Sequence, residues 1–202
     1  IYIGSALSVI FARDVISLYI FWELMALSSV MLVLLRGTLT SRKSAVRYIS
    51  VHIIGGLILL AGIIMYMHST GSIEFSSFNI KSAATWLILT GFLVNAAAIP
   101  FTSWLPDAYP NATVMGGIIL SAYTTKTAVY TLLRGFTGWD VLIWMGAAMA
   151  IYGAIYALLE NDIRRILSYS IINQVGFKVC AIGIGTKLAI AGACAHVFCG
   201  VI

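Results

Sequence analysis

The sequence predicts an all-α fold, a bundle of transmembrane helices that forms one polytopic membrane domain. Of its 202 residues, 61% are hydrophobic and 9% are charged, and the mean hydropathy is +1.01. Soluble domains carry about 25% charged residues, so this composition excludes an ordinary soluble protein. The second observation is a pattern: long apolar runs end at charged or turn-forming residues, as membrane-spanning helices do.

Charged and polar residues mark where each helix is expected to begin and end. Arg13 and Asp14 separate the first two runs, and the polar stretch 36–44 separates the second from the third. The stretch 68–82 precedes the fourth run, which ends at Pro100 because proline lacks the backbone N–H that continues a helix. The expected helices up to this point are Ile1–Ala12, Val15–Leu35, Ala45–Met67 and Ala83–Pro100.

Four further runs complete the pattern. They are separated by short connections at 102–113, 135–140, 160–165 and 186–187. No connection is long enough to hold a soluble domain, so 1–202 is expected to be a single transmembrane domain. The expected helices of this half are Val114–Leu133, Val141–Leu159, Ile166–Gly185 and Leu188–Ile202.

The first and the last of these eight segments are short. From Lys187 to Ile202 a helix would extend about 22 Å, less than the roughly 30 Å thickness of the hydrocarbon core. The sequence also begins at Ile1 without methionine, within an apolar run. We therefore expect a fragment of a longer subunit, incomplete at both ends, with six of its eight helical segments whole.

The basic residues between the helices predict the orientation. If each whole segment crosses the membrane once, six basic residues fall on one side and four on the other. By the positive-inside rule, the side with six is cytoplasmic or equivalent. The six are Arg36, Arg42, Lys43, Arg47, Arg164 and Arg165, and the four are Arg13, Lys81, Arg134 and Lys187.

Five titratable residues lie inside apolar runs, where a charge costs at least a few kcal/mol and usually marks an ion or proton path. Glu23, Lys126, Lys178 and His196 lie about 12 to 14 Å deep from the less basic side, at 1.5 Å per residue. His52 lies about 15 Å deep from the other side. The five are thus expected to form a layer near the membrane midplane, where water or hydroxyl groups would carry protons between them.

Other kinds of site are not indicated. The basic residues gather at the ends of apolar runs, where they set topology, so no nucleic acid is expected as a partner. Cys180, Cys194 and Cys199 are expected to be free thiols, because their spacing is not that of a metal site or a disulfide framework. Without a glycine-rich phosphate loop or paired Cys/His ligands, the sequence predicts no metal site and no cofactor.

Three stretches together resemble the antiporter-like subunits shared by Mrp-type cation/proton antiporters, respiratory complex I and membrane-bound hydrogenases. These stretches read FWELM at 21–25, AAAIPFTSWLPDAYPNATV at 96–114 with TTKTAVYTLLR at 124–134, and ENDIRRILSYSIINQVGF at 160–177. The wording WLPDAYP and the stretch around His52 are most similar to the D-type proteins of Mrp antiporters and their D-like relatives. The resemblance implies other membrane subunits as partners and a bacterial inner membrane as the location.

The resemblance also assigns roles to individual residues. Glu23 matches the glutamate that in this family pairs with a lysine on a broken helix, and Lys126 matches the relay lysine on the next helix. Asn95 stands where the family has the broken-helix lysine, and asparagine cannot titrate. The usual glutamate/lysine switch would then be absent, or carried by another group such as Lys126 or Lys178.

The broken helix is expected around Asn95, Pro100, Trp104, Pro106 and Asp107. Proline frees backbone carbonyls, which a membrane tolerates only where protein or water satisfies them. The alternative is a simple capped turn at the membrane surface. For Asp107 itself, the sequence favours a structural role as a hydrogen-bond acceptor.

Each of the five buried titratable residues also has a structural interpretation. Glu23 would then be a neutral, hydrogen-bonded carboxyl, and the two lysines would extend their ammonium groups to the membrane surface. Lys178, which lies outside the family's usual charged positions, would alternatively contact a neighbouring subunit. His52 and His196 would be neutral packing residues.

Three functions remain open at this stage. The first is proton translocation through the midplane residues in a Mrp-type antiporter, with Na⁺ as a candidate exchange ion. The second is the same role in a proton-pumping subunit of an NADH:quinone oxidoreductase or a related hydrogenase. The third is a scaffold subunit that no longer conducts, because Asn95 replaces the lysine.

Overall fold

The computed structural model describes residues 1–78 and 81–200, and within these residues the fold is helical, as predicted. Two predicted segments therefore extend beyond the description: the connection 68–82 at residues 79–80, and the last helix at residues 201–202. The helices are α1 (Tyr2–Phe11), α2 (Val15–Leu34), α3 (Leu39–Thr70), α4 (Ala83–Asn95), η1 (Phe101–Ser103), α5 (Trp104–Asn111), α6 (Val114–Gly135), α7 (Asp140–Leu159), α8 (Ile163–Ile184) and α9 (Lys187–Cys199).

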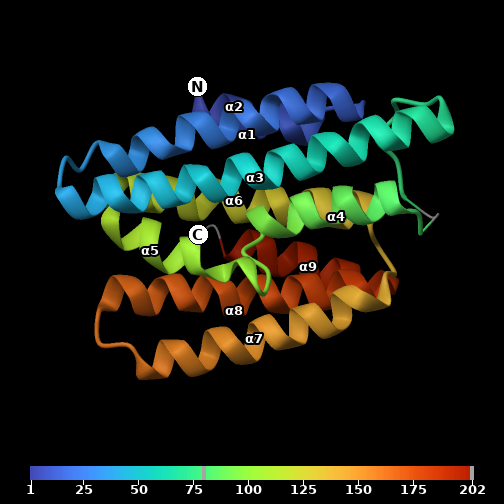
Figure 1. The fold of residues 1–202 in the computed structure, drawn as a ribbon. Helices are drawn as coiled ribbons and strands as arrows, with labels where there is room; N and C mark the ends of the chain where they lie inside the picture. The colour runs from blue at the N-terminus through green and yellow to red at the C-terminus, as the bar shows by residue number, and fades with distance from the viewer. Residues whose placement is uncertain (79–80, 201–202) are drawn as a thin grey trace.

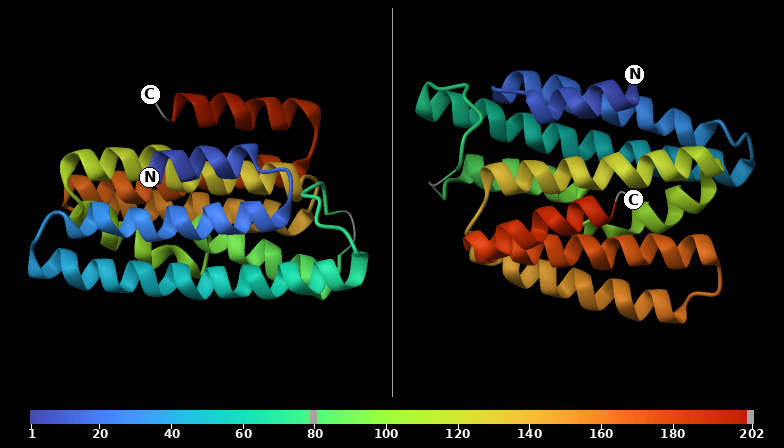
Figure 2. Two further views of the ribbon diagram at one scale, coloured as in Figure 1. Left: turned by 90° about the horizontal axis from the view of Figure 1, so that it is seen from above. Right: turned by 180° about the vertical axis from the view of Figure 1, so that it is seen from behind.

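The long helices run side by side along one direction, and the connections gather at the two ends of the bundle (Figure 1). α3 packs against α2 on one side and against α4 and α5 on the other, while α7 and α8 form a closely packed pair. α9 lies on the outside of the bundle (Figure 2). It packs against α8, and only Ala193 of α9 is fully buried.

The two ends of the bundle separate the basic residues as the sequence predicted. At one end, the Arg134 guanidinium donates hydrogen bonds to the carbonyls of Ala12 at 2.6 Å and Phe75 at 2.9 Å. At the other end, the guanidinium groups of Arg36 and Arg164 donate to the carbonyl of Pro110. We refer to this second end as the basic end.

Two predicted helix boundaries were wrong by five residues or more. α3 begins at Leu39 instead of Ala45, because the Thr38 side chain accepts a hydrogen bond from the Ser41 amide and so caps an earlier start. The helix that was expected to reach Pro100 ends at Asn95, and the expected connection after it contains η1 and α5. The described chain therefore has two more helical segments than the sequence predicted.

By length and composition, four of the described helices could each cross a membrane: α2, α3, α7 and α8. α4 has 13 residues and α5 has 8, so neither can cross alone. They follow one another along α3 and run between the two ends of the bundle (Figure 1), so together they form one broken span.

Glycines allow the closest helix contacts. A Cβ atom on Gly146 of α7 would lie 2.3 Å from the amide nitrogen of Cys180, and one on Gly153 would lie 2.5 Å from that of Asn173. Both distances are shorter than side-chain carbons ever show, so these positions require glycine. Such small residues bring helix backbones together in membranes, where lipid supplies no hydrophobic drive for packing.

Candidate functional site

The predicted broken helix is present between α4 and α5. α4 ends at Asn95, and the backbone is non-helical until η1 begins at Phe101. Within this break Ala97 has a φ of 54° and the Ile99–Pro100 peptide bond is cis. The indole N–H of Trp104 donates a hydrogen bond to the carbonyl of Val94 at 3.0 Å. This bond satisfies one of the carbonyls at the end of α4, as the membrane interior requires.

The residues that follow the break have packing roles. Pro106 is buried in the first turn of α5, where the absence of a backbone N–H does not cost a helical hydrogen bond. Asp107 is partly exposed and forms an ion pair with Arg47, with 3.1 Å between the nearest nitrogen and oxygen. The side chain of Asn95 is buried, and its Nδ2 atom donates no hydrogen bond to any described residue.

Glu23 lies at the contact between α2 and α3. A Cβ atom on Gly56 of α3 would lie only 1.9 Å from Oε1 of Glu23, so the carboxyl occupies the space that the missing side chain leaves. Oε1 is buried, and it makes no hydrogen bond to any described group. Further along the same contact, the Ser29 hydroxyl and the Tyr48 hydroxyl share a hydrogen bond at 2.7 Å.

His52 is fully enclosed on α3. Its Nδ1 atom lies 2.9 Å from the carbonyl of Tyr48. A carbonyl only accepts hydrogen bonds, so Nδ1 must carry the proton, and Nε2 of the neutral ring is left with a free lone pair. The ring stacks on Tyr48 with 4.1 Å between centroids and meets Trp104 edge-on at 4.6 Å. Nε2 is buried and makes no hydrogen bond to a described residue.

Lys126 is 8% exposed and extends from α6. Its ammonium group donates a hydrogen bond to the carbonyl of Ser121 at 2.6 Å. Beside it is a cavity of about 420 Å³ that runs from Lys126 toward the basic end, where Arg164 contributes to its wall. The other polar residues that line this cavity are Tyr109, Thr113, Ser121, Ser168, Ser170 and Gln174.

Lys178 and His196 lie near Lys126. Lys178 is 1% exposed, and its Nζ atom makes no hydrogen bond to any described residue. That atom lies 3.1 Å from the position that a Cβ on Gly200 would occupy, so it fills the space beside Gly200. Lys178 interacts electrostatically with Lys126, and both lysines act on the partly buried His196 of α9. These three residues form the basic group of the site.

Glu23 is not paired with this basic group. The described residues form two ion pairs, Arg47 with Asp107 and Arg165 with Glu160, and neither pair includes one of the five candidate residues. The structure therefore places the five candidates in two groups. Glu23 and His52 lie on α2 and α3, and Lys126, Lys178 and His196 lie on α6, α8 and α9.

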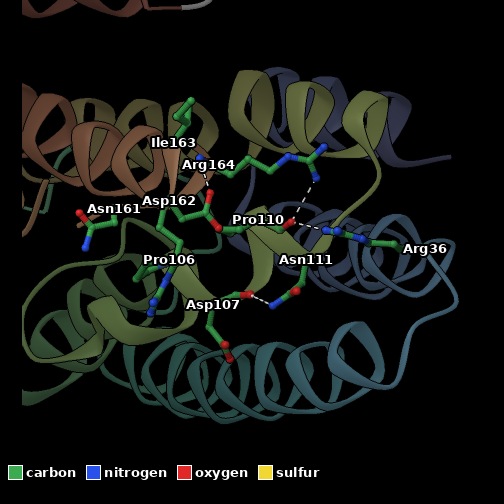
Figure 3. A pocket seen from close by; sticks show the side chains of 10 residues that line it. Arg36, Pro106, Asp107, Pro110, Asn111, Asn161, Asp162, Ile163 and Arg164 are labelled. Carbon is green, nitrogen blue, oxygen red and sulfur yellow. Dashed lines mark hydrogen bonds between the residues drawn. The ribbon is translucent and has the colours of Figure 1, made fainter.

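A larger cavity of about 890 Å³ lies at the basic end, between α5 and the start of α8 (Figure 3). Arg36, just after α2, and Arg164, at the start of α8, both donate to the Pro110 carbonyl, and the Asn111 amide donates to the carbonyl of Asp107 at 2.8 Å. Arg164 lines both this cavity and the one beside Lys126. It therefore stands between the open end of the bundle and the buried lysine.

Residues 12–201 match the family described as the transmembrane region of NADH:quinone oxidoreductase and Mrp antiporter subunits. The chain belongs to this antiporter family. The resemblance seen in the sequence is thus confirmed, and so is the predicted class of a polytopic membrane protein.

Individual relatives come from both branches of the antiporter family. The chain is 28% identical to the D component of the Na⁺/H⁺ antiporter of Alkalihalophilus pseudofirmus, over 89% of the chain and 40% of the relative. It is 30% identical to the NAD(P)H-quinone oxidoreductase chain 5 of a Picosynechococcus species, over 92% of the chain and 31% of the relative. In the structure of the Mrp complex from a Dietzia species, one chain is 32% identical, with a TM-score of 0.90. That match covers 99% of this chain and 24% of the other.

The chain thus spans between about a quarter and two fifths of these relatives' length. The Dietzia chain is part of a complex, which agrees with the prediction that antiporter-family subunits have membrane partners. The prediction of an integral membrane protein likewise agrees with the family match and with the four helices long enough to span a membrane.

Hydroxyl side chains pair between helices of this antiporter-family bundle, and these pairs were not predicted from the sequence. The Tyr2 hydroxyl bonds to Thr124 at 2.6 Å, from helices that are 122 positions apart in the sequence. The buried Tyr109 hydroxyl donates to the carbonyl of Leu120 at 3.1 Å. Together with Ser29 and Tyr48, these three residues supply hydroxyl groups at the contacts between α1, α2, α3, α5 and α6. No local motif signals such pairs, because only the fold brings these helices together.

Proposed function

We propose that the chain conducts protons across the membrane through Glu23, Lys126 and their titratable neighbours, as part of a Mrp-type cation/proton antiporter subunit. The observation that carries this proposal is the cavity that joins Lys126 to Arg164 at the basic end of the bundle and is lined in part by hydroxyl and amide side chains. An ammonium group buried at midplane depth and reached by a cavity with such polar groups can exchange protons with one side of the membrane.

Further support comes from the other buried titratable groups. Lys178, His52 and Glu23 each hold a buried polar atom that no described residue satisfies. Unsatisfied groups of this kind cost free energy in an apolar interior, and they are usually retained for function. Under this proposal Lys126, Lys178 and His196 carry protons on the α6, α8 and α9 side, and Glu23 and His52 do so on the α2 and α3 side.

The relatives' functions favour an antiporter with other membrane subunits as partners. The Alkalihalophilus relative is named as a component of a Na⁺/H⁺ antiporter, so we propose Na⁺ as the exchanged ion and a bacterial inner membrane as the location. The second candidate function is a proton-pumping membrane subunit of a quinone oxidoreductase. It is favoured by the 30% identity to the NAD(P)H-quinone oxidoreductase chain 5. Isolation of the complex with flavin and iron–sulfur proteins would support that candidate, and isolation with small antiporter subunits would support the first.

Proton flux in inverted membrane vesicles tests the proposal, with the full-length subunit assembled in its complex. We expect Glu23→Gln and Lys126→Ala each to reduce Na⁺-dependent proton flux by about 100-fold, while the amount of assembled complex stays constant. Glu74→Gln and Lys187→Ala are matched controls, because both residues are exposed at the less basic end. Wild-type flux in Glu23→Gln and Lys126→Ala would refute the proposal and leave the scaffold function.

A further inference from the structure

The contact between α2 and α3, which we name the α2–α3 seam, is defined by two points. Glu23 lies against Gly56 at one of them, and Ser29 bonds to Tyr48 at the other. The helices run antiparallel, so residues between these points on α3 face residues between them on α2. His52 lies between Tyr48 and Gly56, and its side chain is 2% exposed. Its ring stacks on Tyr48, whose hydroxyl bonds to Ser29 of α2, so His52 lies beside the α2–α3 seam, where it also contacts Trp104 of α5.

Helix geometry places these groups within reach of one another through water. Gly56 follows His52 by one turn of α3, which is about 6 Å along the axis, and residues four apart lie on the same helix face. Hydrogen bonds between water oxygens are about 2.8 Å long. Two bridging water molecules, joined by three hydrogen bonds of about 2.8 Å, would cover about 8 Å, which is more than this axial separation.

The two free atoms are chemically matched. Nε2 of His52 is the unprotonated nitrogen of the ring, because Nδ1 donates to the Tyr48 carbonyl at 2.9 Å. Oε1 of Glu23 is a buried oxygen that accepts no hydrogen bond from a described residue. An acid oxygen and an imidazole lone pair on one seam are a proton donor and a proton acceptor.

We propose that Glu23 and His52 exchange a proton along the α2–α3 seam, so that His52 is the direct partner of Glu23 in transport. In the forward step the O–H bond of the Glu23 carboxyl breaks and an N–H bond forms at Nε2 of His52. This step leaves a carboxylate and an imidazolium, and the bridging waters pass the proton on without net change. The reverse step restores both neutral groups. This inference rests on the proposed function. It assigns His52 the role of proton acceptor for Glu23 within the group of residues on α2 and α3.

The other groups around His52 cannot take this role. Tyr48 stacks on the ring, and its hydroxyl is bonded to Ser29. Trp104 meets the ring from α5, and its N–H is already donated to the Val94 carbonyl. Next to Val94, at the end of α4, Asn95 carries an amide that does not titrate. Among the described contacts of the seam, Glu23 is the group that ionises as an acid.

His52→Gln tests the proposal in vesicles that contain the full-length subunit in its complex, with flux normalised to assembled complex. We expect at least a tenfold loss of proton flux. His68→Gln is the matched control, because His68 lies on the same helix but is exposed near its end. If His52→Gln assembles poorly, His52→Asn serves as the second variant, since its shorter amide leaves more space in the packed interior.

A double mutant separates exchange between the two residues from independent effects. If Glu23 and His52 act as one unit, the variant with both Glu23→Gln and His52→Gln loses no more flux than the more damaging single variant. The inference would be overturned if the fold-loss of flux in the double variant equalled the product of the two single losses. It would also be overturned if His52→Gln kept its flux within twofold of wild type. In both of those cases a large loss in Glu23→Gln would leave the proposed function standing. Wild-type flux in Glu23→Gln would also overturn the inference, and wild-type flux in both Glu23→Gln and Lys126→Ala would refute the proposed function itself.

Discussion

Replacing Gly56 by alanine would move the Glu23 carboxyl without changing its chemistry. The new Cβ atom would lie 1.9 Å from Oε1, and real Cβ contacts are essentially never shorter than 3.0 Å. The carboxyl must therefore retreat by at least 1.1 Å, the difference between these distances. Misplacing a reacting group by about 1 Å can cost 100-fold in rate. We expect Gly56→Ala to lower proton flux by roughly this factor.

The same substitution should not prevent folding. Alanine favours a helix over glycine by about 1 kcal/mol. The group that must move is the end of a flexible glutamate side chain, not backbone. Expression and assembly of the complex, measured by size-exclusion chromatography of detergent extracts, should therefore match wild type. Flux in inverted vesicles should fall.

Gly4→Ala is the matched control, because it adds the same methyl group to a helix, α1, at a position open to its surroundings. Its Cβ would have no heavy atom of another residue within 4 Å beyond its own helix backbone and chain neighbours. We expect its flux to stay within a few-fold of wild type. Equal proton flux in the two variants would mean that the position of the Glu23 carboxyl does not limit transport. The role assigned to the contact between this carboxyl and Gly56 would then be refuted.

Three further outcomes are expected. Asn95→Lys places an ammonium group at the helix break. If the missing lysine limits conduction there, this variant should raise proton flux in vesicles, and unchanged flux would show that the missing lysine is not limiting. Gly153→Val forces α7 and α8 apart at the amide of Asn173 and should at least halve the yield of assembled complex, whereas normal yield would show that the contact is dispensable. Asp14→Ala removes the carboxyl that accepts from the Ser17 amide at 2.7 Å and should cost about 1 kcal/mol of stability. Since that amide lowers the pKa of Asp14 below its usual 3.8, the wild-type advantage in thermal unfolding should be complete above about pH 4 and disappear as the pH falls through the lowered pKa.

The apolar runs predicted the helices well, because the length of a membrane-crossing helix is set by the thickness of the bilayer. Hydropathy could not locate the start of α3. Its first turns, from Leu39 to Ser44, are polar and lie outside the apolar run, and the signal there is the capping side chain of Thr38. The fourth apolar run was expected to stay helical to Pro100, but α4 ends five residues earlier, at Asn95, which is the first residue of the segment where a break was expected.

The candidate site was harder to predict than the fold. Depth along each helix placed Glu23, His52, Lys126, Lys178 and His196 in one layer, but depth does not fix the direction in which a side chain points around the helix axis. Their division into two groups depends on how the helices are arranged around one another. The hydroxyl partners depend on the same arrangement, since Tyr2 and Thr124 meet only in the folded bundle.

The length of α3 has a consequence for the depth of His52 and Gly56 in the bilayer. Its 32 residues extend about 48 Å, some 18 Å more than the hydrocarbon core. The first turns carry Arg42, Lys43 and Arg47, which favour the anionic headgroups of one leaflet. Polar residues from His68 onward occupy the opposite surface. A helix held at both membrane surfaces does not shift easily along the membrane normal. His52 and Gly56, which lie on either side of the midpoint of α3, therefore stay near the centre of the bilayer in lipids of different chain length.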